Sequence, residues 1–240
     1  MRKRAFLLTL AVLTPALAAG QKSLPDPRGA GVEPGKRLAL LVERVRLEQS
    51  QMRTLEAEFV QLKESAFLLE PSEAQGVFSY QAPDRVRWEY QTPDPISLLV
   101  AGDEMTTWYH DLGQAERIHV GRQTQRVLDY LGAGSSMDSL LEYFDARLAH
   151  SSDTSLPFRL ELLPRFERVA RRLREMTIWI DGERFLPIRL RYVEADGDVT
   201  DYRFSNLRVN GEFPDDRFQL DLPQEVDLKV VDLEQGALAR

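Results

Sequence analysis

The sequence of 240 residues contains no cysteine and only three histidines. Without cysteine the chain has no disulfide, no thiol nucleophile and no cysteine-ligated metal, and it cannot itself be an acylated lipoprotein. His110, His119 and His150 do not have the spacing of metal ligands. Nucleophile-elbow, phosphate-loop and dinucleotide-binding motifs are also missing. We therefore expect a protein that is not an enzyme and that carries neither a metal nor a cofactor.

Two short motifs are better explained by local structure than by chemistry. Residues 132–136 read Gly-Ala-Gly-Ser-Ser, but the Lys-Ser/Thr end of a phosphate-binding loop is missing, so a loop before a helix is predicted. Asp103 and Glu104 are neighbouring carboxylates in a turn between two alternating runs. Hairpin turns favour such residues because they are well solvated, and this interpretation is preferred to a catalytic pair.

Long hydrophobic runs are missing except near the N-terminus. Arg2 to Arg4 form a basic segment, Ala5 to Leu13 form an apolar run too short to span a bilayer, and Ala16 to Ala18 supply small residues. This pattern predicts a cleaved signal peptide over residues 1–18, with an uncleaved anchor as the alternative. Export in a two-membrane bacterium leads to the periplasm.

The acidic balance of the chain argues against one class of partner. Removal of three basic residues with the signal peptide lowers the formal net charge from -7 to about -10. Nucleic-acid-binding domains carry basic patches that attract phosphates, and this composition does not favour one. We expect no nucleic-acid partner.

The clearest pattern in the chain lies between Gly76 and Asp111. Val86, Trp88 and Tyr90 alternate with charged residues, which places apolar side chains on one strand face and charges on the other. The neighbouring runs alternate in the same way and are separated by breaks rich in proline, aspartate and glycine. The pattern predicts four strands of an antiparallel meander with one apolar face.

Helices are predicted at two places. Residues 19–35 are rich in proline and glycine and indicate a flexible lead-in. A helix is expected to start near Pro34 and to carry apolar residues at helical spacing as far as Leu55. Ser135 or Ser136 is expected to cap a second helix that runs through Leu148.

The second half of the chain repeats the strand pattern, with Asp-Gly turns between alternating runs. We expect an α+β fold in which two helices form a lid over an antiparallel sheet of about ten strands, with residues 36–240 as a single domain. The runs after residue 111 that predict strands are 117–121, 158–162, 176–180, 188–192, 202–204, 218–222 and 226–233.

Two helices are few for the apolar face of ten strands. A sheet curved by its own twist can leave a cavity beneath such a cover, and a cavity lined by aromatic and aliphatic residues suits acyl chains. Each buried CH₂ contributes about 0.8 kcal/mol to binding. An ordinary filled core explains the periodicity equally well.

An ordered series of short motifs resembles the periplasmic lipoprotein-carrier family (LolA). The likeness covers roughly Leu38 to Leu222 and is densest between Phe59 and Tyr109. The resemblance implies an incomplete β-barrel closed by a helical lid over a hydrophobic cavity. The matching pieces are Phe59-Val60-Gln61, Gly76-Val77-Phe78, Pro83, Arg87-Trp88-Glu89-Tyr90, Pro93, Leu99 to Asp103 and Trp108-Tyr109.

The resemblance implies a carrier that takes lipoproteins from an inner-membrane ABC transporter and passes them to an outer-membrane acceptor lipoprotein. Such a carrier is expected to be a monomer and to bind acyl chains moderately, because cargo held at every methylene cannot be released. The predicted acyl-chain contacts are Phe78, Tyr80, Trp88, Tyr90, Ile96, Leu98, Trp108, Ile178 and Leu190 on the sheet, with Leu140, Leu141 and Phe144 on the covering helix.

One departure from the family pattern concerns the lid. Well-known carriers of the family have a basic residue before the proline that precedes the Trp strand, and there it helps to hold the lid closed. Here that position is Ala82, and alternation places Arg85 and Arg87 on the face opposite Trp88. Two alternatives therefore stay open: a carrier of a free lipid or glycolipid, and a periplasmic sensor of mislocalised lipoproteins.

Overall fold

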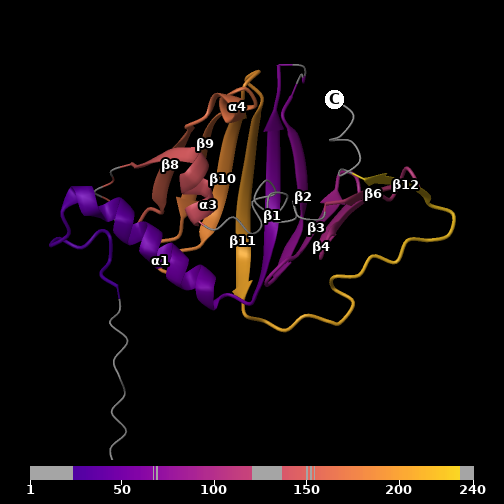
Figure 1. Ribbon diagram of the computed structural model, residues 1–240, viewed down its shortest axis with the longest axis horizontal. Helices are drawn as coiled ribbons and strands as arrows, with labels where there is room; N and C mark the ends of the chain where they lie inside the picture. Colours follow the sequence, from indigo (N-terminus) through magenta and orange to yellow (C-terminus); the bar gives the residue numbers. More distant parts are fainter. Residues whose placement is uncertain are drawn as a thin grey trace, which may run out of the picture.

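The computed structural model describes residues 24–232, except 67, 69, 121–136, 150, 152 and 154. The predicted signal peptide, His150, the Gly-rich loop at 132–136 and the proposed caps Ser135 and Ser136 lie outside these residues. The described chain forms one curved sheet with its helices gathered over one part of it (Figure 1).

Twelve strands form the sheet, in the spatial order β12-β6-β5-β4-β3-β2-β1-β11-β10-β9-β8-β7, where about ten strands were expected. The sheet is open, because the edge strands β7 and β12 are not paired with one another. The strands are β1 Thr54–Glu64, β2 Ser72–Gln81, β3 Arg85–Thr92, β4 Ile96–Ala101, β5 Glu104–Tyr109, β6 Gln114–His119, β7 Phe144–Leu148, β8 Phe158–Pro164, β9 Leu173–Ile180, β10 Pro187–Glu194, β11 Val199–Val209 and β12 Asp227–Asp232.

The predicted meander is confirmed, since β2 to β5 pair in sequence as antiparallel neighbours. Gly102, with φ of 62°, occupies the β4–β5 turn, where a left-handed conformation favours glycine. The expectation of a purely antiparallel sheet is wrong at one edge, because β12 pairs with β6 in parallel. A connection across the sheet precedes β12, and such a crossover delivers the strand in the parallel direction.

The strand expected at residues 218–222 does not form. Residues 211–226 contain no strand, because Pro214 and Pro223 interrupt the segment and donate no backbone hydrogen bonds. Phe218 is instead a buried anchor whose ring contacts Phe213, with ring centroids 5.4 Å apart. The alternating apolar residues of this proline-rich segment thus indicate a side chain that anchors the segment and do not indicate a strand.

The first helix begins with a 3₁₀ turn, η1 Pro34–Lys36, and continues as α1 Arg37–Gln51. It buries Leu41, Val42 and Val45. The helix ends before the expected boundary at Leu55, which belongs to β1. Met52 adopts an extended conformation and leads into that strand.

The second covering helix is shorter than predicted. Helix α3 spans Met137–Tyr143, and the segment Phe144–Leu148 forms β7 and pairs with β8. The placement of Phe144 on the helix is therefore wrong, because this apolar stretch satisfies its backbone groups through the β8 ladder. A further short helix, α4 Glu167–Ala170, connects β8 with β9.

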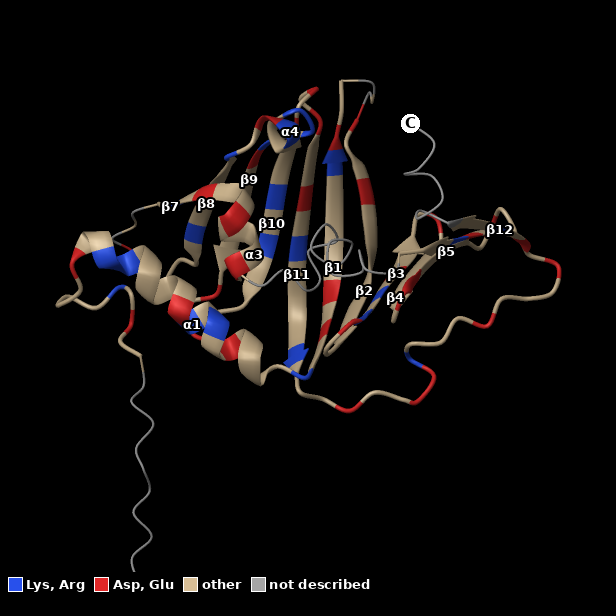
Figure 2. Ribbon diagram, in the orientation of Figure 1, with Lys and Arg blue, Asp and Glu red and all other residues tan. Residues whose placement is uncertain are grey.

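Residues that pair across antiparallel strands share one face of a sheet, so rows can be followed from strand to strand. Ala57, Phe78, Trp88 and Leu98 form such a row, and Leu160, Ile178 and Leu190 form another on the same face. We call this the inner face, because α1 and α3 pack against it. Figure 2 shows charged positions recurring between uncharged ones along β10, β11 and β1, as alternation requires.

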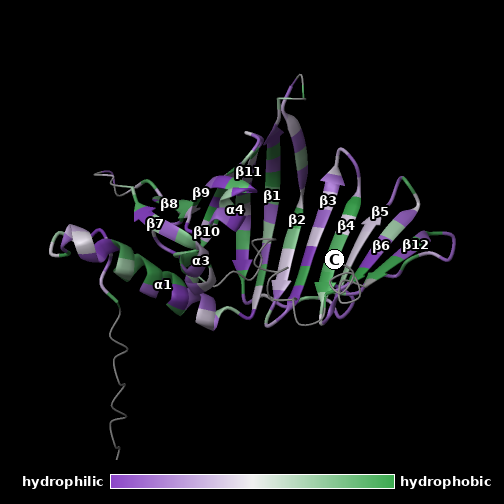
Figure 3. Cartoon of the chain, turned by 45° about the horizontal axis from the view of Figure 1, so that its top comes forward, coloured by the Kyte–Doolittle hydropathy of each residue, from purple (hydrophilic) through white to green (hydrophobic). Residues whose placement is uncertain are grey.

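The opposite, outer face is also covered in part. The guanidinium of Arg87 donates to the backbone carbonyls of Arg217 and Gln219, each at 3.1 Å, which ties residues 211–226 to β3. Ser97 and Leu99 point to this face and are buried. Strand β4 is accordingly hydrophobic over most of its length (Figure 3).

Candidate functional site

The inner face carries two hydrophobic clusters of different composition. The aliphatic cluster lies between the helices and strands β7 to β10. Leu41 and Val45 of α1 and Met137 of α3 are buried there against Leu160 and Ile178. The helices cover this half of the sheet in Figure 1, in front of β8 to β10. Among the described residues, α1 and α3 thus pack against the aliphatic cluster and not against the aromatic cluster.

The aromatic cluster occupies the inner face of β1 to β4 and β11. The Trp88 ring lies 4.8 Å from the rings of both Phe59 and Phe78, measured between centroids, and 5.3 Å from Tyr202. Edge-on and tilted contacts of this kind add about 0.5–1.5 kcal/mol per pair to the burial of the rings. Val86 and Val100 complete its buried part.

Polar atoms are sparse in the aromatic cluster. The hydroxyls of Tyr90 and Tyr202 lie 3.4 Å apart. Burial raises the pKa of Tyr90 above its usual 10.0, although the Tyr202 hydrogen bond acts in the opposite direction. The indole N–H of Trp88 is buried and has no hydrogen-bond partner in the described structure. Unpaired buried donors are uncommon and are expensive in free energy.

Eleven of the twelve predicted contact residues face the inner side or belong to α3. Within the sheet, Phe78, Trp88 and Ile178 are buried, whereas Tyr80, Tyr90, Ile96, Leu98 and Leu190 are half-buried. Leu140 and Leu141 of α3 pack against the aliphatic cluster, which also contains the buried Phe144. The structure therefore brings together residues from both halves of the sequence.

Trp108 does not belong to this group. It pairs with Ser97 and Ala115, which places its ring on the outer face, stacked on His110 with centroids 3.7 Å apart. The prediction that it shares a face with Trp88 is wrong. Alternation within β5 assigns Met105 and Thr107 to the inner face, and aromatic character does not override this alternation.

Several inner-face residues were not predicted. Phe59 is buried at the centre of the aromatic cluster, and Tyr202 and Phe204 pack against it. Their sequence runs alternate apolar and polar residues, and this signal was available. The sequence did not show which strands are neighbours in the sheet, because β1 and β11 pair across more than a hundred residues of sequence.

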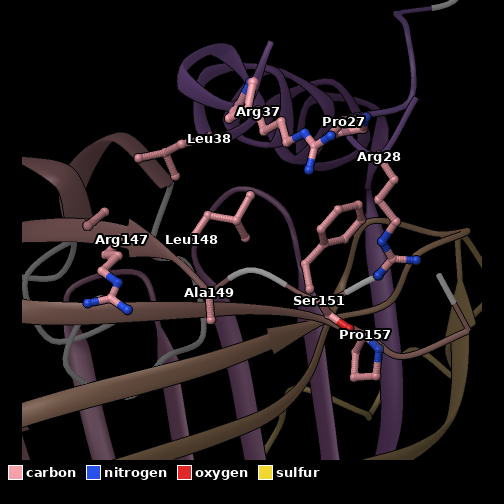
Figure 4. A pocket seen from close by; sticks show the side chains of 12 residues that line it. Pro27, Arg28, Arg37, Leu38, Arg147, Leu148, Ala149, Ser151 and Pro157 are labelled. Atoms are coloured by element: carbon pink, nitrogen blue, oxygen red, sulfur yellow. The ribbon is translucent and has the colours of Figure 1, made fainter. Parts of the chain in front are cut away.

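A pocket opens at one end of the helix-covered half, with a volume of about 350 Å³. It lies between the lead-in segment, the start of α1 and the strands β7 and β8 (Figure 4). Its lining combines apolar residues with arginines and contains no carboxylate among the described residues. The lining residues are Pro27, Arg28, Pro34, Arg37, Leu38, Ala146, Arg147, Leu148, Ala149, Ser151, Pro157 and Phe158.

The family model described as outer membrane lipoprotein carrier protein LolA matches residues 50–221. The chain belongs to the LolA family. An outer-membrane lipoprotein carrier protein of Legionella pneumophila (strain Lens) is 27% identical over 179 residues, covering 74% of this chain and 83% of the relative. The carrier of the same name from Pseudomonas putida (strain W619) is 26% identical over 220 residues, covering 90% and 96%.

A solved structure shares the fold over most of the chain. An uncharacterised conserved protein of Thermus thermophilus superposes with a TM-score of 0.51 at 13% identity, covering 80% of this chain and 98% of that protein. At this identity the likeness concerns the fold alone. The open sheet with α1 and α3 packed against one part of its inner face confirms the predicted incomplete barrel with a helical lid.

Ala82, the position at which the family resemblance implies a basic residue, is exposed and lies in the β2–β3 turn. Its backbone N–H donates to the carbonyl of Arg53, at 2.8 Å. An alanine methyl group offers no hydrogen bond to a helix.

None of the helices in the described part of the chain has both the length and the apolar character that a membrane span requires.

Proposed function

We propose that this protein is a periplasmic carrier that binds the acyl chains of lipoproteins on its inner face and shuttles them from the inner to the outer membrane. The proposal takes residues 1–18 as a cleaved signal peptide and residues 36–240 as the carrier domain, working as a monomer. The observation that carries it is the single apolar face of an open sheet, partly covered by helices, in a member of the LolA family.

Acyl chains would lie across the two clusters. Half-buried Tyr80, Tyr90, Leu98 and Leu190 offer apolar surface that a guest can cover, and buried Trp88 forms the floor between them. Each methylene removed from water contributes about 0.8 kcal/mol, so partial insertion of a few chains holds a lipid in solution. This binding needs no covalent chemistry, and the protein acts as a carrier and not as an enzyme.

Loading on this proposal separates the helices from the sheet. Helices α1 and α3 are joined to one another by the Arg46–Asp138 ion pair and by the Met137 N–H, which donates to Gln49 Oε1 at 3.4 Å. Their contacts with the aliphatic cluster are mostly apolar and non-directional, with the Arg44 guanidinium over the Phe185 ring, 4.3 Å from its centroid, as a polar exception. A lipid chain that replaces these contacts compensates for the area exposed when the helices move. The proposed partners remain an inner-membrane ABC transporter and an outer-membrane acceptor lipoprotein.

The first experiment identifies the cargo of the natural protein. Native mass spectrometry of the mature chain isolated from the periplasm is expected to show a bound triacylated peptide, and solvent extraction is expected to recover the same molecule. Recovery of a free glycolipid or phospholipid alone would favour a lipid carrier. A deletion strain that alters a stress response without accumulating lipoproteins at the inner membrane would favour a sensor.

The second experiment tests the face. Tyr80→Ala on the inner face is expected to weaken binding of a synthetic triacylated peptide about fivefold or more, because a half-buried aromatic contact surface is lost. Trp108→Ala removes an aromatic residue from the outer face and serves as the matched control. Equal losses in the two variants would contradict an inner-face site.

A further inference from the structure

The pocket at the helix-covered end combines positive charge with an apolar wall in a protein whose net charge is -7. Arg28 comes from the lead-in segment, Arg37 from the first turn of α1 and Arg147 from β7. Figure 4 shows Arg28 and Arg147 on opposite sides of the pocket, with Arg37 reaching down from the helix. The lead-in segment and α1 thus bring the guanidinium groups of Arg28 and Arg37 to the pocket, whereas the Arg147 side chain alternates with inner-facing neighbours on β7 and points to the outer face.

The three arginines differ in how far their charges are balanced. Arg147 is mostly exposed and pairs with Glu161 at 3.7 Å. Arg28 donates to the carbonyl of Leu156 and lies over the Phe158 ring, and its charge helps to lower the pKa of Asp153, after the hydrogen bonds from Ser155. These two cations are occupied by protein partners.

Arg37 is the unbalanced group. Its Nε is buried and has no hydrogen-bond partner in the described structure, and within that part of the chain the guanidinium forms no ion pair. A buried donor without a partner raises the free energy of the folded state, and the deficit is larger for charged groups. An anion in the pocket would reach the terminal amino groups of Arg37 and supply the ion pair that the described residues do not.

The shape of the pocket restricts what that anion is attached to. Leu38 and Leu148 line it and also pack against the aliphatic cluster, so its apolar wall continues beneath α1. A volume of about 350 Å³ is at the small end of ligand pockets. It holds a headgroup with a few methylenes, whereas a bare inorganic anion would leave the apolar wall without a partner.

We infer that this pocket binds the phosphate headgroup of an anionic lipid, with Arg37 as the principal hydrogen-bond donor and Arg28 beside it. The lipid tail leaves the pocket along Leu38 and Leu148 toward the layer between α1 and the sheet. The triacylated cysteine end of a lipoprotein has no phosphate, so this site recognises a second class of ligand. The inference does not depend on lipoprotein shuttling.

Calorimetric titration of the mature chain with lyso-phosphatidylglycerol, below its micelle concentration, tests the inference. Arg37→Gln is expected to weaken binding about tenfold, the effect of one charge-assisted hydrogen bond. Arg37→Lys is expected to lie between this variant and the natural protein. Lyso-phosphatidylcholine, whose headgroup carries no net charge, is expected to bind about tenfold more weakly than lyso-phosphatidylglycerol.

Lys36→Gln is the matched control. It removes the same charge one residue away, from a side chain that is 73% exposed, pairs with Glu33 and does not line the pocket. Equal losses in Lys36→Gln and Arg37→Gln would overturn the inference, since the effect would then be one of net charge. Equal binding of the two lysolipids would overturn it as well.

Two further outcomes distinguish a lipid headgroup site from a plain phosphate site and from the acyl-chain site. Inorganic phosphate that binds as tightly as lyso-phosphatidylglycerol would overturn the assignment to a lipid. Arg37→Gln is expected to leave binding of the triacylated peptide unchanged. If the triacylated peptide fails to bind any variant while the lysolipid binds, the carrier proposal fails and the headgroup site stands.

Discussion

The two halves of the inner face are held together by different forces. The aliphatic half depends on contacts between layers, because Leu41 and Val45 of α1 meet Leu160 and Ile178 of the sheet. The aromatic half depends on contacts within the sheet, where Phe59, Trp88 and Tyr202 come from β1, β3 and β11, which lie within four consecutive strands. Movement of the helices therefore disturbs the first half and leaves the second in place.

The largest effect is expected in the aromatic half. Trp88→Ala should lower the free energy of unfolding by about 3–5 kcal/mol, because a large buried ring is replaced by a cavity. Trp88→Phe should cost less than Trp88→Ala, because it leaves a smaller cavity and the indole N–H has no partner to lose. Urea denaturation measures both. Similar losses for the two variants would show that the N–H does have a role in the folded state.

The next effect concerns the aliphatic half. Leu41→Ala should lower the free energy of unfolding by about 2–4 kcal/mol and raise amide exchange in α1 more than in β1 to β3. Backbone hydrogen exchange followed by mass spectrometry distinguishes the regions. Leu47→Ala on the same helix is the control, because Leu47 is partly exposed. Equal acceleration of amide exchange in α1 and in β1 to β3 would contradict the distinction between the two halves.

Close packing in the aromatic half predicts a third effect. A Cβ at Gly76 would lie 2.0 Å from the backbone oxygen of Glu89 and 2.8 Å from the Phe59 ring. Gly76→Ala should therefore destabilise the protein by about 1–3 kcal/mol, because two strands must move apart. Gly35→Ala meets nothing within 4 Å and provides the control for thermal unfolding. An equal shift in both variants would contradict this packing.

The smallest effect is one of pH. Burial raises the pKa of Tyr90 in the folded state above 10.0, so the unfolded chain releases this proton first as pH rises. The stabilising contribution is complete below pH 10.0 and is lost as pH rises through the folded pKa. Tyr90→Phe should thus show a shallower loss of stability at alkaline pH, measured by urea denaturation. An unchanged slope would indicate that the Tyr90 hydroxyl is solvated.

Much of the sheet could be predicted because alternation is a local property of the chain. The runs around Trp88 and Leu190 determine which side chains share a strand face, and the family resemblance supplied the lid. The end of α3 was missed because Phe144 to Leu148 is apolar enough for either structure, and only its pairing with β8 decides.

The contents of the candidate site were less accessible to sequence reasoning. Trp108 shows that aromatic character does not reveal the face, since one residue of register reverses it. The pocket with Arg28 and Arg37 joins two segments to a strand more than a hundred residues away. Partners brought together at that distance leave no periodic pattern in the sequence.

The parallel pairing of β12 with β6 has a consequence for contacts between molecules. Strand β6 would otherwise end the sheet with open hydrogen-bonding groups, which attract further strands from other chains. With β12 in place, the two borders of the sheet are β12, a strand of six residues that carries Asp227 and Lys229, and β7, a strand of five residues that carries Asp145 and Arg147. Short, charged borders discourage the addition of strands from other chains, so the sheet ends at both sides in strands that disfavour polymerisation through the backbone.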